Sequence, residues 1–340
     1  MADKIKVGII GAGRIGKVHA ESIAYHIPEA ELVTVSDPFL NADIEKFMKN
    51  LGVKKVTKDY KEIINDKDID AVLVCSPTNT HSQYSIEAAN AGKHIFCEKP
   101  IDMEIDKIKE TVKAVEKAGV KFQVGFNRRF DHNFSKVKSL VKEGKIGDIH
   151  VVRITSRDPA APPAEYIKGS GGLFLDMTIH DFDMARYLSG SEVEEVFAYG
   201  AVLVDPAIGK AGDIDTAVIT LKFANGALGI IENSRQAVYG YDQRVEVFGS
   251  KGAVEVSNDT PSSAVLSTKE GVSGEKPLYF FLERYMESFT EEKRQFFAAI
   301  RNKTAVPVSV TDGLKPVIIA KAALKSVKEG RAVKISEIDK

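Results

Sequence analysis

Apolar residues recur along this chain in two different patterns, and the first fills residues 4 to about 125. There, short β-branched runs alternate with longer stretches in which apolar residues recur at helical spacing. The expected strands are Ile5–Ile10, Leu32–Ser36, Ala71–Cys75, His94–Cys97 and Phe122–Val124. The expected helices are Ile15–Tyr25, Ala42–Asn50, Ser82–Ala91 and Glu104–Lys117. Such alternation predicts an α/β fold, with a doubly wound parallel sheet covered by helices on both faces.

The second pattern begins near residue 126, where longer segments alternate apolar and polar residues with a period of two. These expected strands are Ile149–Thr155, Val193–Val204, Thr216–Phe223, Ala227–Ser234, Gln243–Phe248 and Ala253–Ser257. Helical spacing interrupts them near 174–188 and returns near 289–302 and 312–329. The pattern predicts an α+β domain with a large, mainly antiparallel sheet. We therefore expect two domains, 1–125 and 126–340.

The charge composition argues against some classes of binding partner for these two domains. The 340 residues include 47 basic and 48 acidic side chains, for a formal net charge of −1, so no overall field attracts nucleic acid or an anionic membrane. The N-terminal apolar run, Val7 to Ile10, is too short for a signal peptide. The two cysteines, Cys75 and Cys97, suggest no disulfide framework and have no assigned role. A cytoplasmic protein is expected.

The segment Gly11–Gly16 reads Gly-Ala-Gly-Arg-Ile-Gly, directly after the first expected strand and at the start of a helix. In a dinucleotide-binding Rossmann domain, the first glycine permits a tight turn and the second lets the backbone approach a pyrophosphate. The third allows close helix–strand packing, and the helix N-terminus stabilises the phosphate charge. The alternative is a structural glycine turn in another α/β protein. The expected cofactor contacts here are Gly11, Gly13, Arg14 and Ile15.

An acid at the end of the second strand indicates which dinucleotide binds. Asp37 lies 21 residues past Gly16, where a carboxylate accepts hydrogen bonds from the ribose hydroxyls and repels a 2′-phosphate. The next residues offer no basic side chain for that phosphate, and Lys17 is more plausible as a helix-surface residue. NAD is therefore favoured over NADP. Alternatively, Asp37 serves only the turn before Pro38.

Polar residues also follow the third and fourth long strands, at the edge of the sheet where doubly wound folds bind ligands. The residues expected at the cofactor are Ser76, Thr78, Asn79, His81, Glu98 and Lys99. A lysine at this edge would stabilise negative charge on an alcohol oxygen. The alternatives are an ordinary loop with Thr80 as N-cap and, for Glu98 and Lys99, a surface ion pair.

Asp176 and His180 lie four residues apart in a helical stretch, on one face of one turn. A neutral imidazole is well suited to accept an alcohol proton near neutral pH, and a carboxylate would orient it. The alternatives are a structural Asp–His pair and a metal site that adds Asp181 and Asp183. Those two acids lie on other faces, which leaves two ligands facing one way, so no metal is expected.

Taken together, these motifs resemble the glucose–fructose oxidoreductase / inositol dehydrogenase / rhizopine-catabolism family over the whole chain. The stretches 127–131, 156–159, 176–184 and 233–244 are most similar to its inositol 2-dehydrogenases. The resemblance implies a catalytic triad: Lys99 holds the reacting hydroxyl, His180 is the general base, and Asp176 bonds the substrate and tunes His180. It also implies a homo-oligomer, a dimer or a tetramer, formed through the open face of the second sheet.

The same resemblance implies NAD-dependent oxidation of a secondary alcohol on a polyol ring, with myo-inositol converted to its 2-keto product. Residues of the implied substrate pocket are Lys99, Arg129 or its neighbour Arg128, Arg157, Asp158, Asp176, His180 and Tyr239. One alternative changes the substrate to another inositol isomer, a sugar or an anhydrosugar. Another is a non-catalytic sensor that binds NAD and a protein partner.

Overall fold

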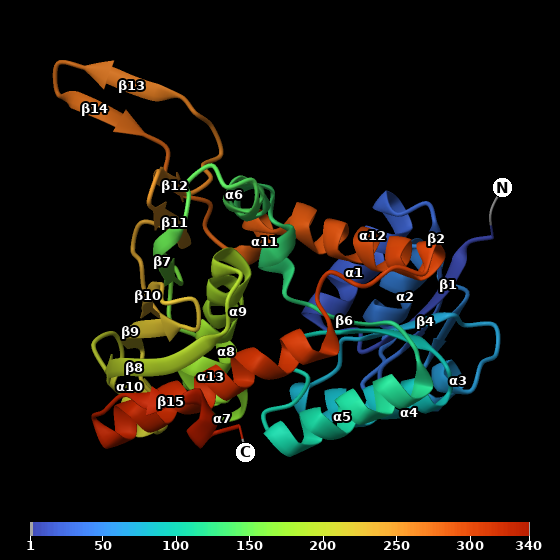
Figure 1. Cartoon of the computed structure of the whole chain (residues 1–340). Coiled ribbons are helices and arrows are strands. Elements are labelled where there is room, and N and C mark those ends of the chain that lie inside the picture. Colours follow the sequence, from blue (N-terminus) through green and yellow to red (C-terminus); the bar gives the residue numbers. More distant parts are fainter. Residues whose placement is uncertain (1–2, 340) are drawn as a thin grey trace. The chain divides into compact units, whose positions relative to one another are not determined.

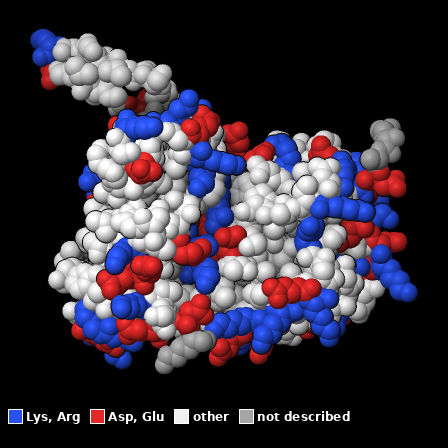
Figure 2. Space-filling view, viewed as in Figure 1, with Lys and Arg blue, Asp and Glu red and all other residues white. Residues whose placement is uncertain are grey.

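The computed structural model describes residues 3–339 and divides the chain into two compact units. The first unit runs from the N-terminal strand to Phe130 and also takes in Met286–Lys315. The second comprises Asp131–Tyr285 and the chain from Pro316 onward. Acidic and basic side chains are interspersed on the face shown in Figure 2, in line with the balanced composition. Within residues 3–339, no helix has the length and apolar character needed to cross a bilayer.

The first unit is built on a six-stranded sheet with the order β3-β2-β1-β4-β5-β6, in which every pair is parallel (Figure 1). The strands are β1 (Ile5–Ile10), β2 (Ala30–Ser36), β3 (Lys55–Thr57), β4 (Ala71–Val74), β5 (His94–Cys97) and β6 (Phe122–Val124). This confirms the predicted Rossmann-type sheet, and only the short edge strand β3 was not predicted. In register, Ile10 pairs with Ser36 and Val74, and Cys97 pairs with Val74 and Val124. The polar loops that follow these strands therefore emerge along one edge.

Helices connect these strands and bury apolar faces against the sheet. They are α1 (Arg14–His26), α2 (Ala42–Asn50), α3 (Lys61–Ile64), α4 (His81–Asn90) and α5 (Ile105–Ala118). Local signals set several ends: the Asn41 side chain accepts the amide of Ile44 and caps α2, and Gly119 ends α5 in the left-handed conformation. The predicted helices lie within a residue or so of these bounds.

Helix α12 (Met286–Asn302) belongs to the first unit although it lies far along the chain. Phe296 and Phe297 are 0% and 1% exposed and belong to the same core as Val7 and Phe96. Burying two phenylalanines is worth about 3–6 kcal/mol, which explains why this helix returns. The continuous division at residue 126 did not anticipate this return. Helix α13 (Val310–Glu329) continues the chain into the second unit, with Pro316 inside it.

The second unit is built on a seven-stranded sheet with the order β12-β11-β7-β10-β9-β8-β15. Its strands are β7 (Ile149–Arg157), β8 (Val193–Ala201), β9 (Thr216–Phe223), β10 (Leu228–Ser234), β11 (Asp242–Gly249), β12 (Gly252–Val256) and β15 (Val333–Lys334). Only β7 and β10 pair in parallel, which confirms the predicted mainly antiparallel sheet. A separate hairpin, β13 (Val265–Thr268) and β14 (Gly271–Gly274), extends from it with exposed side chains (Figure 1).

One face of this sheet is covered by helices and the other is open. Besides the larger part of α13, the helices of the unit are α6 (His132–Lys142), α7 (Ala164–Ser170), α8 (Gly172–Asp176), α9 (Thr178–Ser189), α10 (Pro206–Lys210) and α11 (Phe281–Arg284). Burial alternates strictly along β9, as expected for a sheet with one solvated face. Helix α9 packs on β7 and β10, so the side chains that point toward α9 define the covered face.

Candidate active site

The glycine-rich loop after β1 has the geometry of a phosphate-binding turn. Gly11 has φ +101°, and a Cβ there would lie 2.6 Å from the carbonyl of Cys75. A Cβ on Gly16 would lie 2.0 Å from the Gly11 carbonyl oxygen, so α1 packs too closely for any side chain. Space is open above Gly13, and no side chain caps the first turn of α1. An anion therefore has both room and unpaired backbone amides to bind.

Asp37 ties the end of β2 to this loop. Its Oδ2 accepts the amide of Ala12 at 2.7 Å, and its Oδ1 accepts the amide of Phe39 at 2.8 Å. The second bond is the turn that the sequence offered as an alternative, and the first holds the glycine loop. Because a carboxylate accepts about four hydrogen bonds, capacity remains for ribose hydroxyls. Lys17 lies over the ring of Phe47 on the helix surface.

The loop after β4 is connected to the loop after β5 through His81. The buried ring lies 2.7 Å from the Ser76 carbonyl through Nε2 and 2.8 Å from the Pro100 carbonyl through Nδ1. The Lys99–Pro100 peptide bond is cis. Thr78 and Asn79 lie in a short 3₁₀ turn, with Asn79 exposed. Since both ring nitrogens of His81 lie within hydrogen-bond distance of main-chain carbonyls, a direct cofactor contact by this residue stays a prediction.

The end of β5 carries a buried carboxylate beside the half-buried Lys99. Glu98 is 8% exposed; its Oε1 lies 2.6 Å from Nε2 of His19, and its Oε2 accepts the amide of Lys99 at 3.3 Å. Burial raises the pKa of Glu98, but the hydrogen bond from His19 and nearby positive charge outweigh it, and the pKa is lowered. Glu98 is therefore a fixed anion, in contrast to the surface ion pair weighed above.

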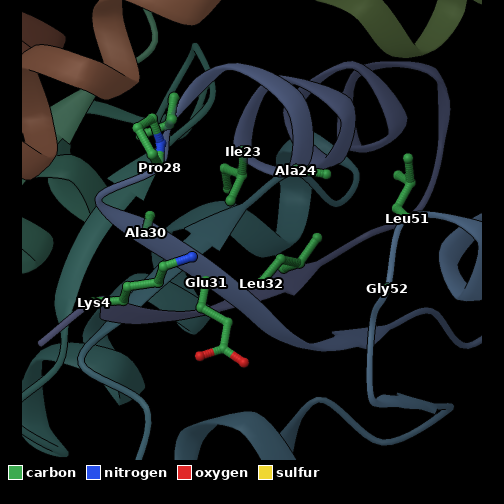
Figure 3. A pocket seen from close by; sticks show the side chains of 10 residues that line it. Lys4, Ile23, Ala24, Pro28, Ala30, Glu31, Leu32, Leu51 and Gly52 are labelled. Carbon is green, nitrogen blue, oxygen red and sulfur yellow. The ribbon is translucent and has the colours of Figure 1, made fainter.

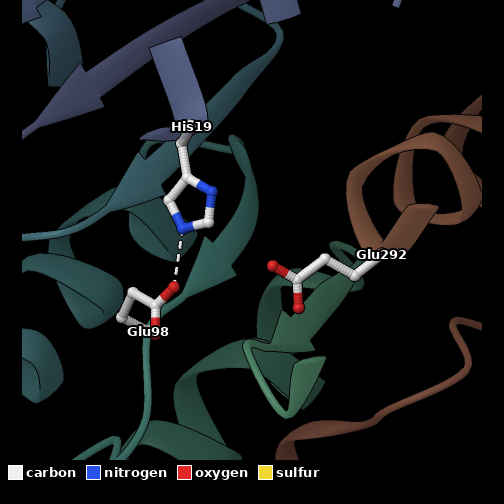
Figure 4. Close-up of side chains that lie close together, drawn as sticks. All are labelled: His19, Glu98 and Glu292. Carbon is white, nitrogen blue, oxygen red and sulfur yellow. Dashed lines mark hydrogen bonds and ion pairs between the residues drawn. The ribbon is translucent and has the colours of Figure 1, made fainter. Parts of the chain in front are cut away.

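Within the described residues, two groups of histidine and carboxylate side chains lie close enough together to bind a metal ion. In each group, a lysine or arginine side chain already pairs with one of the members. The first is His19, Glu98 and Glu292, shown in Figure 4. The Lys293 ammonium lies 2.6 Å from Nδ1 of His19 and 3.5 Å from Oε1 of Glu292. In the second, Asp131, His132 and Asp259, the Arg284 guanidinium bonds Asp131 and lies 2.9 Å from Asp259. Both groups thus already have a cation.

In the second unit, the helix that carries the candidate base is broken beside it. Asp176 ends α8 and His180 lies in the first turn of α9, with Met177 between the two helices. The sequence predicted one continuous turn. Asp176 is held from two sides: its Oδ2 lies 3.0 Å from a guanidinium nitrogen of Arg235, and its Oδ1 accepts the hydroxyl of Tyr166 at 2.9 Å. The carboxylate is therefore oriented independently of any substrate.

Arg235 is the principal site residue that the sequence analysis missed. It is 3% exposed, and its Nη1 also lies 3.4 Å from Asp158. Burial lowers the pKa of Arg235, yet Asp176 and Asp158 reverse this, and the pKa is raised. Burial and Asp176 likewise raise the pKa of Tyr166. The available signal was a lone arginine directly after a buried strand, within the stretch 233–244.

Buried polar contacts fix α9 on the sheet. Asn233 of β10 donates to Oδ2 of Asp181 at 2.8 Å and accepts the hydroxyl of Thr178 at 2.7 Å. Asp181 is fully buried and Asp183 is 1% exposed. The bond from Asn233 to Asp181 helps to hold the turn that carries His180.

Arg157 and Tyr239 lie on the opposite, open face of the sheet. Arg157 pairs with Ser234, and because strand side chains alternate, it points away from the face of Asn233. Its guanidinium bonds Glu232 and the Tyr239 hydroxyl. The structure therefore does not bring these two residues together with Asp176.

Arg129 lies in the first unit, where it bonds Asp312 at 3.1 Å. With these contacts, the pocket roles of Arg129, Arg157 and Tyr239 stay predictions. Asp158 shares its partner Arg235 with Asp176.

A small cavity of about 190 Å³ lies elsewhere in the first unit (Figure 3). Its lining includes Lys4 and Glu31, at the amino ends of β1 and β2. The glycine loop follows the carboxyl end of β1, so this cavity is at the wrong edge of the sheet for a cofactor.

The chain belongs to the GFO/IDH/MocA family of oxidoreductases. Residues 5–126 match the oxidoreductase family's NAD-binding Rossmann fold, and residues 134–255 match the GFO/IDH/MocA C-terminal domain. This confirms the resemblance found in the motifs, and with it the NAD-binding class of the first unit.

Several proteins similar to this chain are named inositol dehydrogenases. The chain is 52% identical to the myo-inositol 2-dehydrogenase of Thermotoga maritima, over 98% of this chain and 99% of that protein. It is 47% identical to the inositol 2-dehydrogenase of Rhizobium meliloti, over 98% and 99%. A crystal structure of scyllo-inositol dehydrogenase from Lactobacillus casei, with bound NAD(H) and scyllo-inositol, matches with a TM-score of 0.91 and 35% identity over 98% and 100%.

Proposed function

We propose that this protein oxidises myo-inositol to its 2-keto product with NAD⁺. The observation that carries the proposal is that this chain combines three features. The first unit has a complete dinucleotide-binding loop and a strand that ends in Glu98-Lys99-Pro100. In the second unit, Asp176 is held in place beside the turn that carries His180. Relatives that cover nearly the whole chain are named for this reaction. Family membership makes the protein an oxidoreductase, and the substrate is our proposal.

In this proposal, His180, Lys99 and Asp176 each have a separate role in the reaction. His180 accepts the hydroxyl proton, and Lys99 stabilises the negative charge that develops on the oxygen. NAD⁺ supplies the hydride acceptor at the nicotinamide C4. A positioned base contributes about 10²–10⁴-fold to the rate. Asp176, oriented by Arg235 and Tyr166, bonds a substrate hydroxyl and favours the protonated form of His180.

The substrate pocket is proposed to extend from Asp176 to Asp158. Arg235 joins the two carboxylates, and carboxylates suit vicinal hydroxyls because each accepts several hydrogen bonds. Arg129, Arg157 and Tyr239 are proposed as further contacts on the family resemblance alone.

A second candidate substrate is scyllo-inositol, favoured by the solved relative that holds it. Both candidates, other inositols and pyranose sugars should be tested for NADH formation with NAD⁺ and with NADP⁺. The proposal expects the highest kcat/KM for myo-inositol with NAD⁺. Turnover of a sugar alone would contradict the substrate, and tight NADH binding without any turnover would favour a non-catalytic sensor.

We also infer that the enzyme is a homotetramer assembled through the open face of the second sheet, with a dimer as the alternative. Tyr199 and Val218 pair on that face and are 69% and 47% exposed. Leu228 and Phe248, 54% and 45% exposed, both pair with Val151 on the same face. Exposed apolar side chains of this size on one face of a sheet support its burial against another copy of the chain. Light scattering after gel filtration tests the assembly.

The cofactor and the free cysteines support a cytoplasmic site of action. Cys75 and Cys97 are both unpaired and buried, a state typical of a reducing compartment. Fractionation of the source cells tests the location.

A further inference from the structure

Four ionisable side chains are buried together in the first unit, beneath the strand end that carries Lys99. They are His19 of α1, Glu98 after β5, and Glu292 and Lys293 of α12, with exposures of 0%, 8%, 0% and 0%. Figure 4 shows that Nε2 of His19 points toward Glu98 and bonds it. The carboxylate of Glu292 lies near both side chains without a bond to either. Burying charge is costly unless it is paired, so this arrangement requires an explanation.

Hydrogen-bond direction defines the state of His19. An ammonium only donates, so Nδ1 of His19 accepts from Lys293 at 2.6 Å. An ionised carboxylate only accepts, so Nε2 carries the proton and donates to Glu98 at 2.6 Å. A neutral imidazole with its proton on Nε2 satisfies both neighbours. Burial and the charge of Lys293 agree with this state, since they lower the pKa of His19 to about 4.

The charges in this group balance across the ring. Lys293 is the cation and Glu98 the anion, and Lys293 also donates to the carbonyl of Phe289. Burial raises the pKa of Glu292 well above its usual range, and the positive charge of Lys293 opposes this shift only in part. Burial lowers the pKa of Lys293, against the attraction of Glu292 and Glu98. The result is a neutral buried chain from Lys293 through His19 to Glu98.

The chain ends on the backbone of Lys99. One oxygen of Glu98 is used by His19, and the other accepts the Lys99 amide at 3.3 Å. The carboxylate is also packed against Gly125: a Cβ there would lie 3.0 Å from Oε2 of Glu98. The backbone of β5 is fixed at this point too, because Gly125 donates to the Cys97 carbonyl at 2.8 Å.

We propose that Lys293 is a positioning residue for the dehydrogenase reaction, acting through His19 and Glu98 to fix the main chain from which the Lys99 side chain reaches the substrate. This inference rests on the proposed function, because Lys99 must act on the alcohol for its position to affect turnover. A misplacement of about 1 Å costs about 100-fold in rate.

The first experiment separates positioning from general stability. Lys293→Met removes the charge and keeps the volume, and Arg294→Met is the matched control, since Arg294 pairs with Glu291 on the surface of the same helix. For Lys293→Met we expect kcat to fall about 100-fold, with a much smaller change in the Kd of NADH measured by fluorescence titration. The control should match the wild type. Unchanged kcat, or kcat and NADH affinity lost by the same factor, would overturn the proposal.

Two substitutions of His19 provide a rescue test. A glutamine amide accepts with its oxygen and donates with its nitrogen, so His19→Gln can bridge Lys293 and Glu98, whereas His19→Leu cannot. The proposal expects His19→Gln to retain much more kcat than His19→Leu at equal NADH affinity. Equal kcat in the two variants would count against it.

The protonation state of His19 can be measured without any enzyme turnover. This measurement distinguishes failure of this inference from failure of the proposed function. The titratable groups that face His19 are Lys293 and Glu292 of α12 and Glu98, and the buried thiol of Cys75 interacts with Glu98 and Lys293. In ¹⁵N spectra of the seven histidines, the His19 signal should show the neutral Nε2–H form and not titrate between pH 8 and about 5. In Lys293→Met its pKa should rise. A protonated His19 in the wild type would refute the chain, and a wild type without turnover but with this spectrum would refute only the proposed function.

Discussion

Replacing Arg235 tests the buried group that orients Asp176. Arg235→Met keeps the length of the side chain but leaves Asp158 and Asp176 together without their shared cation. The arginine side chain is 4% exposed and that of Asp176 12%, so solvent screens little of the loss. Removing one partner from a buried ion pair costs about 3–5 kcal/mol, and we expect a loss of that size in the free energy of unfolding.

The assay is urea unfolding, with Arg153→Met as control. Arg153 lies in the same unit, on β7, but its side chain is 57% exposed and lies 3.9 Å from Glu246, so its loss should cost at most about 1 kcal/mol. Arg235→Lys should fall between the two, because it keeps the charge and loses the forked geometry. A loss below about 1 kcal/mol for Arg235→Met would refute the conclusion that this arginine neutralises both carboxylates.

Three further substitutions test the cofactor site and the base. His180→Ala should lower kcat by about 10²–10⁴-fold and leave NADH affinity, measured by calorimetry, unchanged; retained turnover would remove His180 as the base. Gly16→Ala should abolish NADH binding, because its Cβ would lie 2.0 Å from the Gly11 carbonyl oxygen; normal affinity would contradict the packing argument. Asp37→Ser should raise kcat/KM for NADP⁺ relative to NAD⁺ by about tenfold or more, since it removes a charge that repels the 2′-phosphate; an unchanged ratio would assign Asp37 only to the turn.

Much of the first unit could be predicted because its signals are local. Strand–helix alternation predicted five of its strands, and the helix Ala42–Asn50 was predicted with both ends correct. The glycine loop was recognised from its place between β1 and α1. The return of α12 could not be predicted in this way, because its two phenylalanines complete a core formed by residues 200 or more positions earlier.

In the second unit, alternation predicted six of the seven strands of the large sheet and missed the short β15. The site, however, depends on contacts between distant residues. Arg235 meets Asp176 only after β10 and α8 have packed, so no spacing in the sequence predicts the pair. Arg157 and Asp158 are adjacent in the chain and both polar, yet they point to opposite faces of the sheet. The pairing register of the strands decides which residues point to which face of the sheet, and the sequence alone did not reveal that register. The β13–β14 hairpin was missed because its exposed residues lack an alternating pattern.

The most direct test of the central claim follows the hydride itself. The purified enzyme is given NAD⁺ and myo-inositol labelled with deuterium at C2, and the products are analysed by mass spectrometry. Our account predicts deuterated NADH and the 2-keto product in equal amounts. NADH without the label would place the oxidation at another carbon, and absence of NADH would contradict the assignment of this chain as an inositol dehydrogenase.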